Sequence, residues 1–153
     1  MPYTRTLSVT TLVAGVMMSI TACSSSNDPS GRYTLDTELS VDFTEVRCRM
    51  KGVIKDKEEA QAAAKQLLQG VSGSIEFTAG DTVNASIQLD DGRVRTLRGS
   101  WRHDHPQHLL LTDGDDESVA WRPLWVDGSN ALNLVVPTKS SRAVLVFTQP
   151  HQQ

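Results

Sequence analysis

Three histidines close together form a compact group of possible metal ligands. His103, His105 and His108 lie around Asp104 in the segment HDHPQH. Two histidines two apart on a strand point to the same side, and imidazole binds zinc and copper well. The pair His105-Pro106, however, is typical of a loop tip, where side-chain directions are not fixed, and no further ligand group is evident. We therefore interpret HDHPQ as a solvated loop and expect no metal site.

Carboxylates and nucleophiles give no stronger indication of chemistry. The segment DGDDE, residues 113–117, has the density of carboxylates that calcium favours, but it lacks the glycine and the closing glutamate of a calcium loop. Turn formation alone explains it. No serine lies in a nucleophile elbow, and Cys48 has no histidine near it in the sequence. We therefore predict that the chain is not an enzyme and needs no cofactor.

Five aromatic residues lie on segments with the pattern of strands: Tyr33, Phe77, Trp101, Trp121 and Trp125. They could line an apolar cavity, which is the usual ligand site of an eight-stranded barrel. Side chains alone can also fill a barrel this small, and filling is the interpretation that we favour. Binding of a small hydrophobic ligand by these residues stays open as the alternative.

A cysteine follows an apolar run near the start of the chain. The run, residues 7–20, has 14 residues, whereas a permanent membrane helix needs about 20 apolar residues. Arg5 precedes the run and small residues follow it, which is typical of a signal peptide. The segment ITAC, ending at Cys23, resembles the lipobox of bacterial lipoproteins.

The lipobox resemblance implies a covalent lipid anchor. In that family the cysteine thiol takes a diacylglycerol, the peptide is cut before it, and the new amino group is usually acylated, commonly with palmitate. We therefore expect removal of residues 1–22 and membrane attachment through Cys23. Each buried methylene contributes about 0.8 kcal/mol, so two or three acyl chains anchor durably. Ser24 stands where lipoproteins of the inner membrane often carry Asp, so the resemblance implies the outer membrane, with the domain facing the periplasm.

The mature chain is expected to be short and mildly acidic. Removal of residues 1–22 leaves 131 of the 153 residues, enough for one domain with a modest core. Because Arg5 is the only charged residue removed, the formal net charge falls from −3 to −4, which argues against nucleic acid as a partner. Residues 23–30 are predicted to be the lipidated cysteine and a flexible tether, followed by a single β domain at 31–149. Cys48 is then the only thiol, and we expect it to be buried.

Most of the domain shows the alternation that is typical of strands. Residues 31–36 alternate, and so do 38–43 through Leu39, Val41 and Phe43, whereas 46–54 are ambiguous. After Gly70, apolar segments separated by turn-forming residues predict seven more strands. Their approximate ranges are 74–78, 82–89, 93–102, 108–112, 118–126, 131–136 and 142–148. Pro123 predicts an edge or a bulge in the segment 118–126, because proline cannot donate to a strand ladder.

One helix is expected at about residues 57–69. Asp56 suits its N-cap, Glu59 completes a capping box, and Gly70 suits its end. Apolar residues form one stripe along it, at Ala60, Ala64, Leu67, Leu68 and Val71. The stripe is rich in alanine, so we expect the helix to lie close against a sheet or to close the end of a barrel.

These elements predict a mainly β fold: an antiparallel meander that forms a small barrel or a curled sandwich, with one inserted helix. Their order over residues 31–125 resembles that of small bacterial lipoproteins with lipocalin-like domains. The resemblance rests on the 57–69 helix and on three short motifs, Gly31-Arg32-Tyr33, Asp91-Gly92 and Gly99-Ser100-Trp101. It implies a lipocalin-like barrel but no particular activity.

Three functions are compatible with these features. We favour a non-catalytic envelope lipoprotein that acts as a protein-binding or assembly module at the outer membrane, with an unknown envelope protein as partner. The second is a lipocalin-like carrier of a small hydrophobic ligand. The third is an inhibitor or immunity protein against a cell-wall hydrolase, because small β-barrel lipoproteins that inhibit lysozyme resemble the chain in size and in Ser72-Gly73-Ser74. Those proteins usually carry a disulfide, which Cys48 alone cannot form, and Ser72–Ser74 also suits a helix-to-strand connector.

Overall fold

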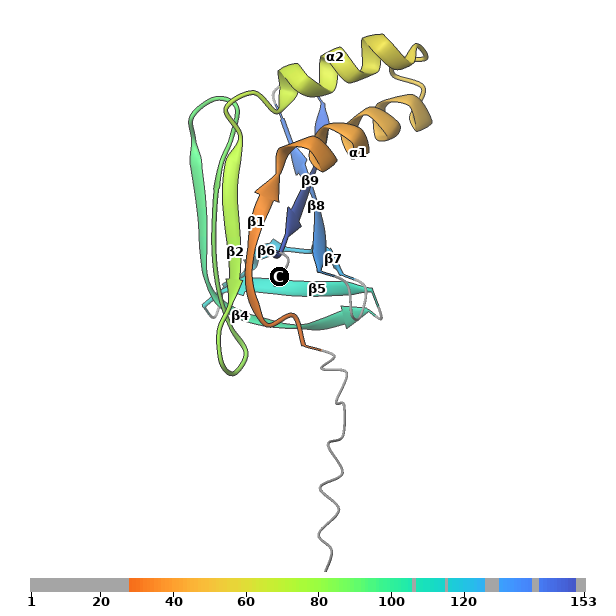
Figure 1. Ribbon diagram of the computed structural model, residues 1–153. Coiled ribbons are helices and arrows are strands. Elements are labelled where there is room, and N and C mark those ends of the chain that lie inside the picture. Colours follow the sequence, from red (N-terminus) through yellow and green to blue (C-terminus); the bar gives the residue numbers. More distant parts are fainter. Residues whose placement is uncertain (1–27, 106, 115, 126–129, 139–140, 151–153) are drawn as a thin grey trace, which may run out of the picture.

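The computed structural model of the chain describes residues 28–105, 107–114, 116–125, 130–138 and 141–150. They form nine strands and two helices (Figure 1). In chain order these are β1 Gly31–Asp36, α1 Thr37–Met50, α2 Lys57–Leu67, β2 Ser72–Phe77, β3 Thr82–Gln88, β4 Val94–His105, β5 His108–Asp113, β6 Asp116–Trp121, β7 Leu124–Trp125, β8 Ala131–Pro137 and β9 Arg142–Thr148. The expected signal peptide and Cys23 lie outside the described residues. Neither described helix has the length and apolar character needed to cross a membrane.

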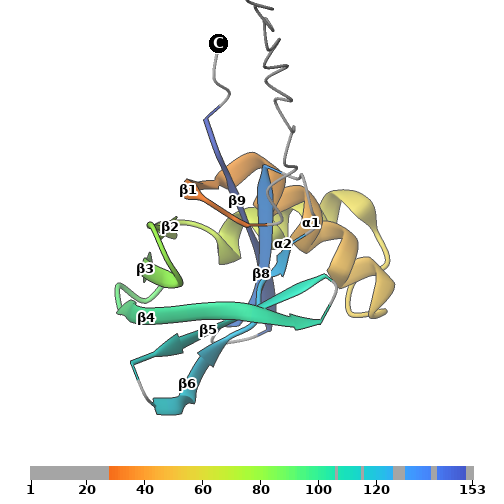
Figure 2. The same cartoon turned by 90° about the horizontal axis from the view of Figure 1, so that it is seen from below.

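Eight of the nine described strands close into a barrel (Figures 1 and 2). Their order around the ring is β4-β3-β2-β1-β9-β8-β7-β5, and pairing of β4 with β5 closes it. Every neighbouring pair is antiparallel. Strand β6 pairs with β5 outside the ring. The expected barrel is thus confirmed, and closure pairs the strand edges that would otherwise stay open.

Alternation along the strands decides which side chains fill the barrel. In β3, Val83, Ala85 and Ile87 are buried while the residues between them are exposed, as the period of two predicts. On β2, Ile75 and Phe77 are buried as expected. The same core takes Leu97 of β4 and residues of β5, β8 and β9. The inward-facing residues of all these strands therefore form one continuous core.

Gly99 on β4 allows the ring to close tightly. A Cβ atom placed on Gly99 would lie 1.9 Å from the carbonyl oxygen of Thr112 and 2.6 Å from the backbone nitrogen of Gly114. Both atoms are backbone atoms and cannot rotate away. The pairing of β5 with β6 shifts register between Thr112 and Asp113, and such irregularities commonly need a residue without a side chain nearby.

The predicted helix at 57–69 is confirmed as α2. The Asp56 carboxylate caps it and accepts a hydrogen bond from the Glu59 backbone N–H at 2.9 Å. Ala60 and Ala64 are fully buried, and the alanines allow close contact with α1, which packs against α2. Gly70 follows the helix with a φ of 77°, a conformation that glycine adopts without strain. Figure 1 shows the two helices as a hairpin at one end of the barrel.

The predicted strand at 38–43 is wrong, because those residues belong to α1. Asp36 caps this helix and accepts a hydrogen bond from the Leu39 N–H at 3.0 Å. The alternation of Leu39, Val41 and Phe43 has another origin: Val41 points inward, whereas Leu39 and Phe43 lie on the outer face. The ambiguous segment that follows is partly the second half of α1.

The buried face of α1 carries polar residues beside Val41 and Cys48, and two of its hydroxyl groups join it to β9. The Val146 N–H donates to Ser40 Oγ at 2.9 Å, and the Val144 N–H donates to Thr44 Oγ1 at 2.9 Å. Strand β1 pairs with β9 only from Thr148 to Val146, so α1 continues the coverage of β9 where β1 ends. The two hydroxyls satisfy backbone groups that a strand would otherwise pair.

Three smaller predictions are also corrected. The segment 118–126 forms two strands, β6 and β7, which are separated at Pro123 because proline cannot donate in a ladder. HDHPQ is not simply a loop, since β4 runs through His105 and β5 begins at His108. Ser72–Ser74 are not a connector but the start of β2, paired with Ser86–Gln88.

Candidate functional site

The outer face of α1 carries an exposed apolar stripe. Leu39, Phe43, Val46 and Met50 are 38%, 45%, 47% and 82% exposed. They lie at i, i+4, i+7 and i+11, which places them on one face of a helix. The buried residues of α1 include Ser40, Thr44 and Glu45 and lie on the opposite face. The helix therefore exposes an apolar stripe, while its buried face is mixed, with Ser40, Thr44 and Glu45 beside Val41 and Cys48.

Charged residues flank one side of this apolar stripe. By helical spacing, Asp42 and Arg49 are two turns apart on the same side. Arg49 Nη1 lies 3.1 Å from Glu45 Oε1, and the Glu45 side chain is 8% exposed. The acid lies beside the first half of the stripe and the base beside the second half.

The stripe lies on the helical end of the barrel. Gly31, where the chain enters β1, is at the opposite end of that strand from Asp36, where α1 begins. Figure 1 shows the chain entering the barrel at the end away from the helices. A six-residue strand is about 17 Å long, so the stripe and the entry of the chain are well separated.

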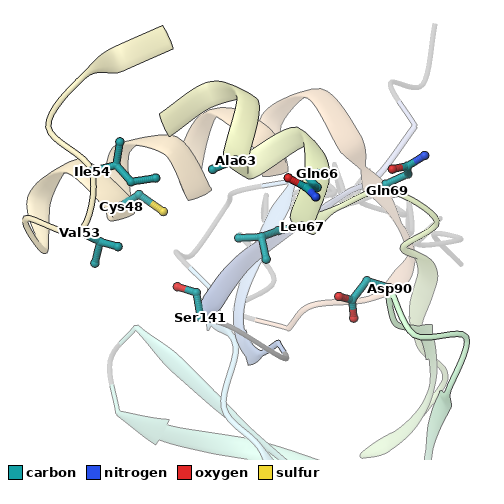
Figure 3. A pocket seen from close by; sticks show the side chains of 9 residues that line it. All are labelled: Cys48, Val53, Ile54, Ala63, Gln66, Leu67, Gln69, Asp90 and Ser141. Atoms are coloured by element: carbon teal, nitrogen blue, oxygen red, sulfur yellow. The ribbon is translucent and has the colours of Figure 1, made fainter. Parts of the chain in front are cut away.

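A cleft lies between the helical hairpin and the turns at the same end of the barrel (Figure 3). Its volume is about 640 Å³. Figure 3 shows Cys48 of α1 and Leu67 of α2 projecting toward each other across it. The full lining is Cys48, Val53, Ile54, Ala63, Gln66, Leu67, Gln69, Asp90 and Ser141. A second hollow of about 330 Å³ continues from it, and its lining is Arg47, Cys48, Lys51, Val53, Ser141 and Arg142.

Four of the five predicted aromatic residues meet inside the barrel. Tyr33, Phe77, Trp101 and Trp125 are at most 8% exposed. The rings of Tyr33 and Phe77 meet edge to face at 5.8 Å between centroids, and so do those of Phe77 and Trp101. Two effects act on the pKa of Tyr33. Burial raises it, and a hydrogen bond with the Trp125 side chain lowers it. Burial is the larger effect, so the pKa of Tyr33 lies above 10.0. These side chains pack into the core, and ligand binding by them stays a prediction.

The fifth aromatic residue, Trp121, is partly buried and lies beside a smaller hollow. That hollow has a volume of about 250 Å³ and includes Leu89 and Val136 in its lining, with Arg95 and Arg122. Small-molecule sites commonly have volumes of about 300–1,000 Å³, so the hollow is below the common range. The indole N–H of Trp101 is buried and has no hydrogen-bond partner within the described part of the chain.

The histidines do not converge into a metal site. His105 and His108 face each other across the β4–β5 pair, with 5.8 Å between ring centroids. His103 instead contacts the Trp101 ring edge to face and the Trp125 ring at a tilt. Among the described residues, no group of three or more histidine, cysteine or acidic side chains is placed to hold a metal ion.

Cysteine chemistry is divided between two parts of the chain. Cys23, the predicted lipidation site, lies outside the described residues. Cys48 is a free thiol and is buried, as expected, so it is not placed to bridge two copies.

Sequence reasoning missed α1 and both surfaces that it builds. Two signals could have found the helix: Asp36 at a capping distance from Leu39, and the heptad spacing from Leu39 to Met50.

Comparisons with known proteins give no family. A scan against protein-family models finds no match, and a search of curated proteins finds none.

Proposed function

We propose that the chain is a non-catalytic lipoprotein of the outer membrane, anchored through Cys23, whose domain binds another envelope protein in the periplasm. The observation that carries the proposal is the apolar stripe on α1. Leu39, Phe43, Val46 and Met50 are all exposed and share one helix face, so the helix presents an apolar stripe to water. Such patches commonly mark interaction sites.

The spacing of the stripe favours one mode of recognition. An amphipathic helix that lies in a groove of its partner contacts it through residues at i, i+3 or i+4, and i+7. Leu39, Phe43, Val46 and Met50 follow this spacing over three turns. We infer a partner with an apolar groove, a basic residue opposite Asp42 and an acidic residue opposite Arg49.

The contact area favours a grooved partner over a second copy of the chain. Two α1 helices meeting stripe to stripe would share a single face of 14 residues each. Stable interfaces commonly bury about 1,200–2,000 Å² in total, and one helix face against another stays below that range. A groove covers the stripe and its flanks together and therefore buries more.

The position of the stripe supports the same proposal. With Cys23 in the membrane, residues 24–30 give a tether of at most about 3.5 Å per residue before β1. The Gly31 end of the barrel is then the end joined to the anchor, and the helical end is the one farther from it along β1. A protein in the periplasm can reach the stripe without contacting the membrane.

Site-specific photo-cross-linking in intact cells tests this proposal. A photoreactive phenylalanine analogue replaces Phe43 in the full chain. The control places the same analogue at Val135 of β8, which is 44% exposed, close to the 45% of Phe43. We expect one cross-linked protein at position 43 and none at position 135, with the reacted partner residues lying in an apolar groove.

Further substitutions decide whether the stripe itself binds. In the chain that carries the photoreactive analogue at position 43, Val46→Glu should abolish the cross-linked product. The carboxylate would be buried in the interface without a partner. Asp42→Arg should weaken that product several-fold, whereas Val94→Glu on β4 should leave it unchanged. A product of twice the mass of the chain, a product with lipid alone, or equal yields at positions 43 and 135 would overturn the proposal.

A further inference from the structure

We propose that the cleft between the helical hairpin and the barrel end binds a single-chain amphiphile with an anionic head. Its chain lies in the larger hollow and its head at the smaller one. This site is separate from the apolar stripe on α1, so the inference goes beyond the proposed function. It also differs from the barrel interior, where the aromatic side chains pack together.

The apolar part of the larger hollow suits an alkyl chain, and Gln66, Gln69, Asp90 and Ser141 form the polar rest of its lining. At about 640 Å³ the hollow is within the common range of small-molecule sites. Val53 and Ile54 lie on one side of it, and Ala63 and Leu67 of α2 on the other (Figure 3). These side chains are apolar, and Val53 is 65% exposed. Covering them removes apolar surface from water, which is favourable in proportion to the area covered.

The smaller hollow suits an anionic head. Arg47, Lys51 and Arg142 line it, and within the described residues none of these side chains forms an ion pair. Cations at the C-terminal end of a helix are favoured by the helix dipole, which accounts for Arg47 and Lys51. Arg142 begins β9, so the dipole of α1 does not account for its position. Three cations around one hollow can bind a carboxylate or a phosphate.

The two hollows together set the class and direction of the ligand. They share Cys48, Val53 and Ser141, so the two hollows adjoin. Asp90 lines only the larger hollow, and its negative charge disfavours an anionic head at that end. A free anion would leave the apolar part uncovered, and a neutral hydrocarbon would leave the cations unused. A fatty acid and a lysophospholipid share the required chemistry.

Calorimetric titration of the full chain carrying Cys23→Ala tests the proposal. In this variant Cys48 is the single thiol, which the reactivity experiment below requires. The probes are dodecanoate and lysophosphatidylglycerol, with dodecyl maltoside and inorganic phosphate as controls for the chain and the head alone. We expect one molecule of dodecanoate per chain, at least tenfold tighter than either control. Each methylene removed from the fatty acid should weaken binding by at most about fourfold. Tighter binding of lysophosphatidylglycerol would assign the ligand to membrane lipid, and tighter binding of dodecanoate to free fatty acid.

Reactivity of Cys48 locates the bound ligand. Cys48 lines both hollows but is only 5% exposed, so a maleimide should modify it slowly, and an occupied cleft should slow that reaction further. By mass action, dodecanoate at ten times its Kd should slow the modification about tenfold. Modification at an unchanged rate with bound ligand would place the ligand elsewhere and overturn the proposal.

Matched variants separate the head and chain contributions. Arg142→Gln should weaken dodecanoate binding about two- to fivefold, whereas Lys65→Gln, on α2 outside the cleft, should not change it. Ala63→Phe fills the larger hollow and should abolish binding, while Ala62→Phe, on the exposed neighbour, should preserve it. Equal affinity for dodecanoate and dodecyl maltoside, no binding at all, or equal behaviour of the matched variants would overturn the proposal. Val46→Glu should leave dodecanoate binding intact, so failure here is distinguishable from failure of the protein-docking proposal.

Discussion

The hydroxyl of Thr44 should contribute substantially to stability, although threonine is an ordinary residue in a helix. Thr44 is fully buried. Its Oγ1 accepts a hydrogen bond from the Val144 N–H at 2.9 Å and lies 3.3 Å from the Val144 carbonyl oxygen. Replacing it with valine keeps the shape of the side chain and removes both hydrogen bonds. The Val144 N–H is then buried without a partner.

The expected loss follows from the unpaired backbone groups. A buried donor that loses its partner costs about 1–3 kcal/mol, and loss of the weaker bond at 3.3 Å adds to that. We expect Thr44→Val to lower the free energy of unfolding by about 2–3 kcal/mol, which lowers the melting temperature by roughly 6–12 °C for a domain of this size. Thr44→Ser keeps the hydroxyl and loses one methyl group, at a cost of about 0.8 kcal/mol.

Urea denaturation followed by circular dichroism measures the difference between the two variants. The expected order of stability is wild type, then serine, then valine. If valine is as stable as serine, the hydroxyl does not replace a strand partner for β9, and the explanation for the buried hydroxyls of α1 is wrong. A changed m-value in either variant would indicate that the folded or unfolded state itself has changed.

Three further predictions concern the barrel and the anchor. Gly99→Ala should destabilise the fold by about 1–3 kcal/mol or prevent folding, because its Cβ would collide with the carbonyl oxygen of Thr112; a melting temperature equal to that of wild type would contradict this. Burial raises the pKa of Tyr33 above 10.0, so stability should fall as pH rises above about 10, where the unfolded chain ionises first and the folded protein still holds the proton. Tyr33→Phe should flatten that part of the stability profile, and an unchanged slope in denaturant titrations at pH 9 to 11 would refute it. Cys23→Ala should abolish incorporation of radioactive palmitate and release the chain from the membrane fraction, whereas Cys48→Ala should retain both.

The strands after Gly70 were largely predictable because burial in β3 and β8 follows the alternation of residue types, while β5 and β9 are short apolar runs that are buried on both faces. In β3 every second residue is apolar and inward. The barrel followed from the number and spacing of such segments. The interruption at Pro123 was anticipated as an edge or a bulge, but the separate pairing of β6 with β5 and of β7 with β5 and β8 depends on the fold.

Helix α1 was harder to predict, because its buried face mixes polar and apolar residues. Ser40 and Thr44 face the core beside Val41, whereas Leu39 and Phe43 are exposed, so the alternation of Leu39, Val41 and Phe43 suggested a strand. Hydrogen bonds to β9 across 100 residues or more of sequence justify the buried hydroxyls. No local pattern contains that information.

The two binding surfaces were missed for the same reason. The cleft brings together Cys48, Leu67 and Ser141 from three separate segments, and only the fold places them side by side. The stripe on α1 was visible as a spacing, but its exposure depends on which face packs against β9. Four of the five aromatic residues, in contrast, were correctly grouped from their places on predicted strands, whereas Trp121 lies on β6 outside the ring.

The helical hairpin leaves and re-enters the barrel between β1 and β2, which pair directly through Thr34 and Ser74. Its two connections are therefore neighbours, and the ring of hydrogen bonds is complete without it. Substitutions at Phe43 or Met50 change a surface that has no part in closing the ring. Affinity for a partner can consequently be altered by mutation while the barrel keeps its stability, provided that the hydroxyls facing β9 are retained.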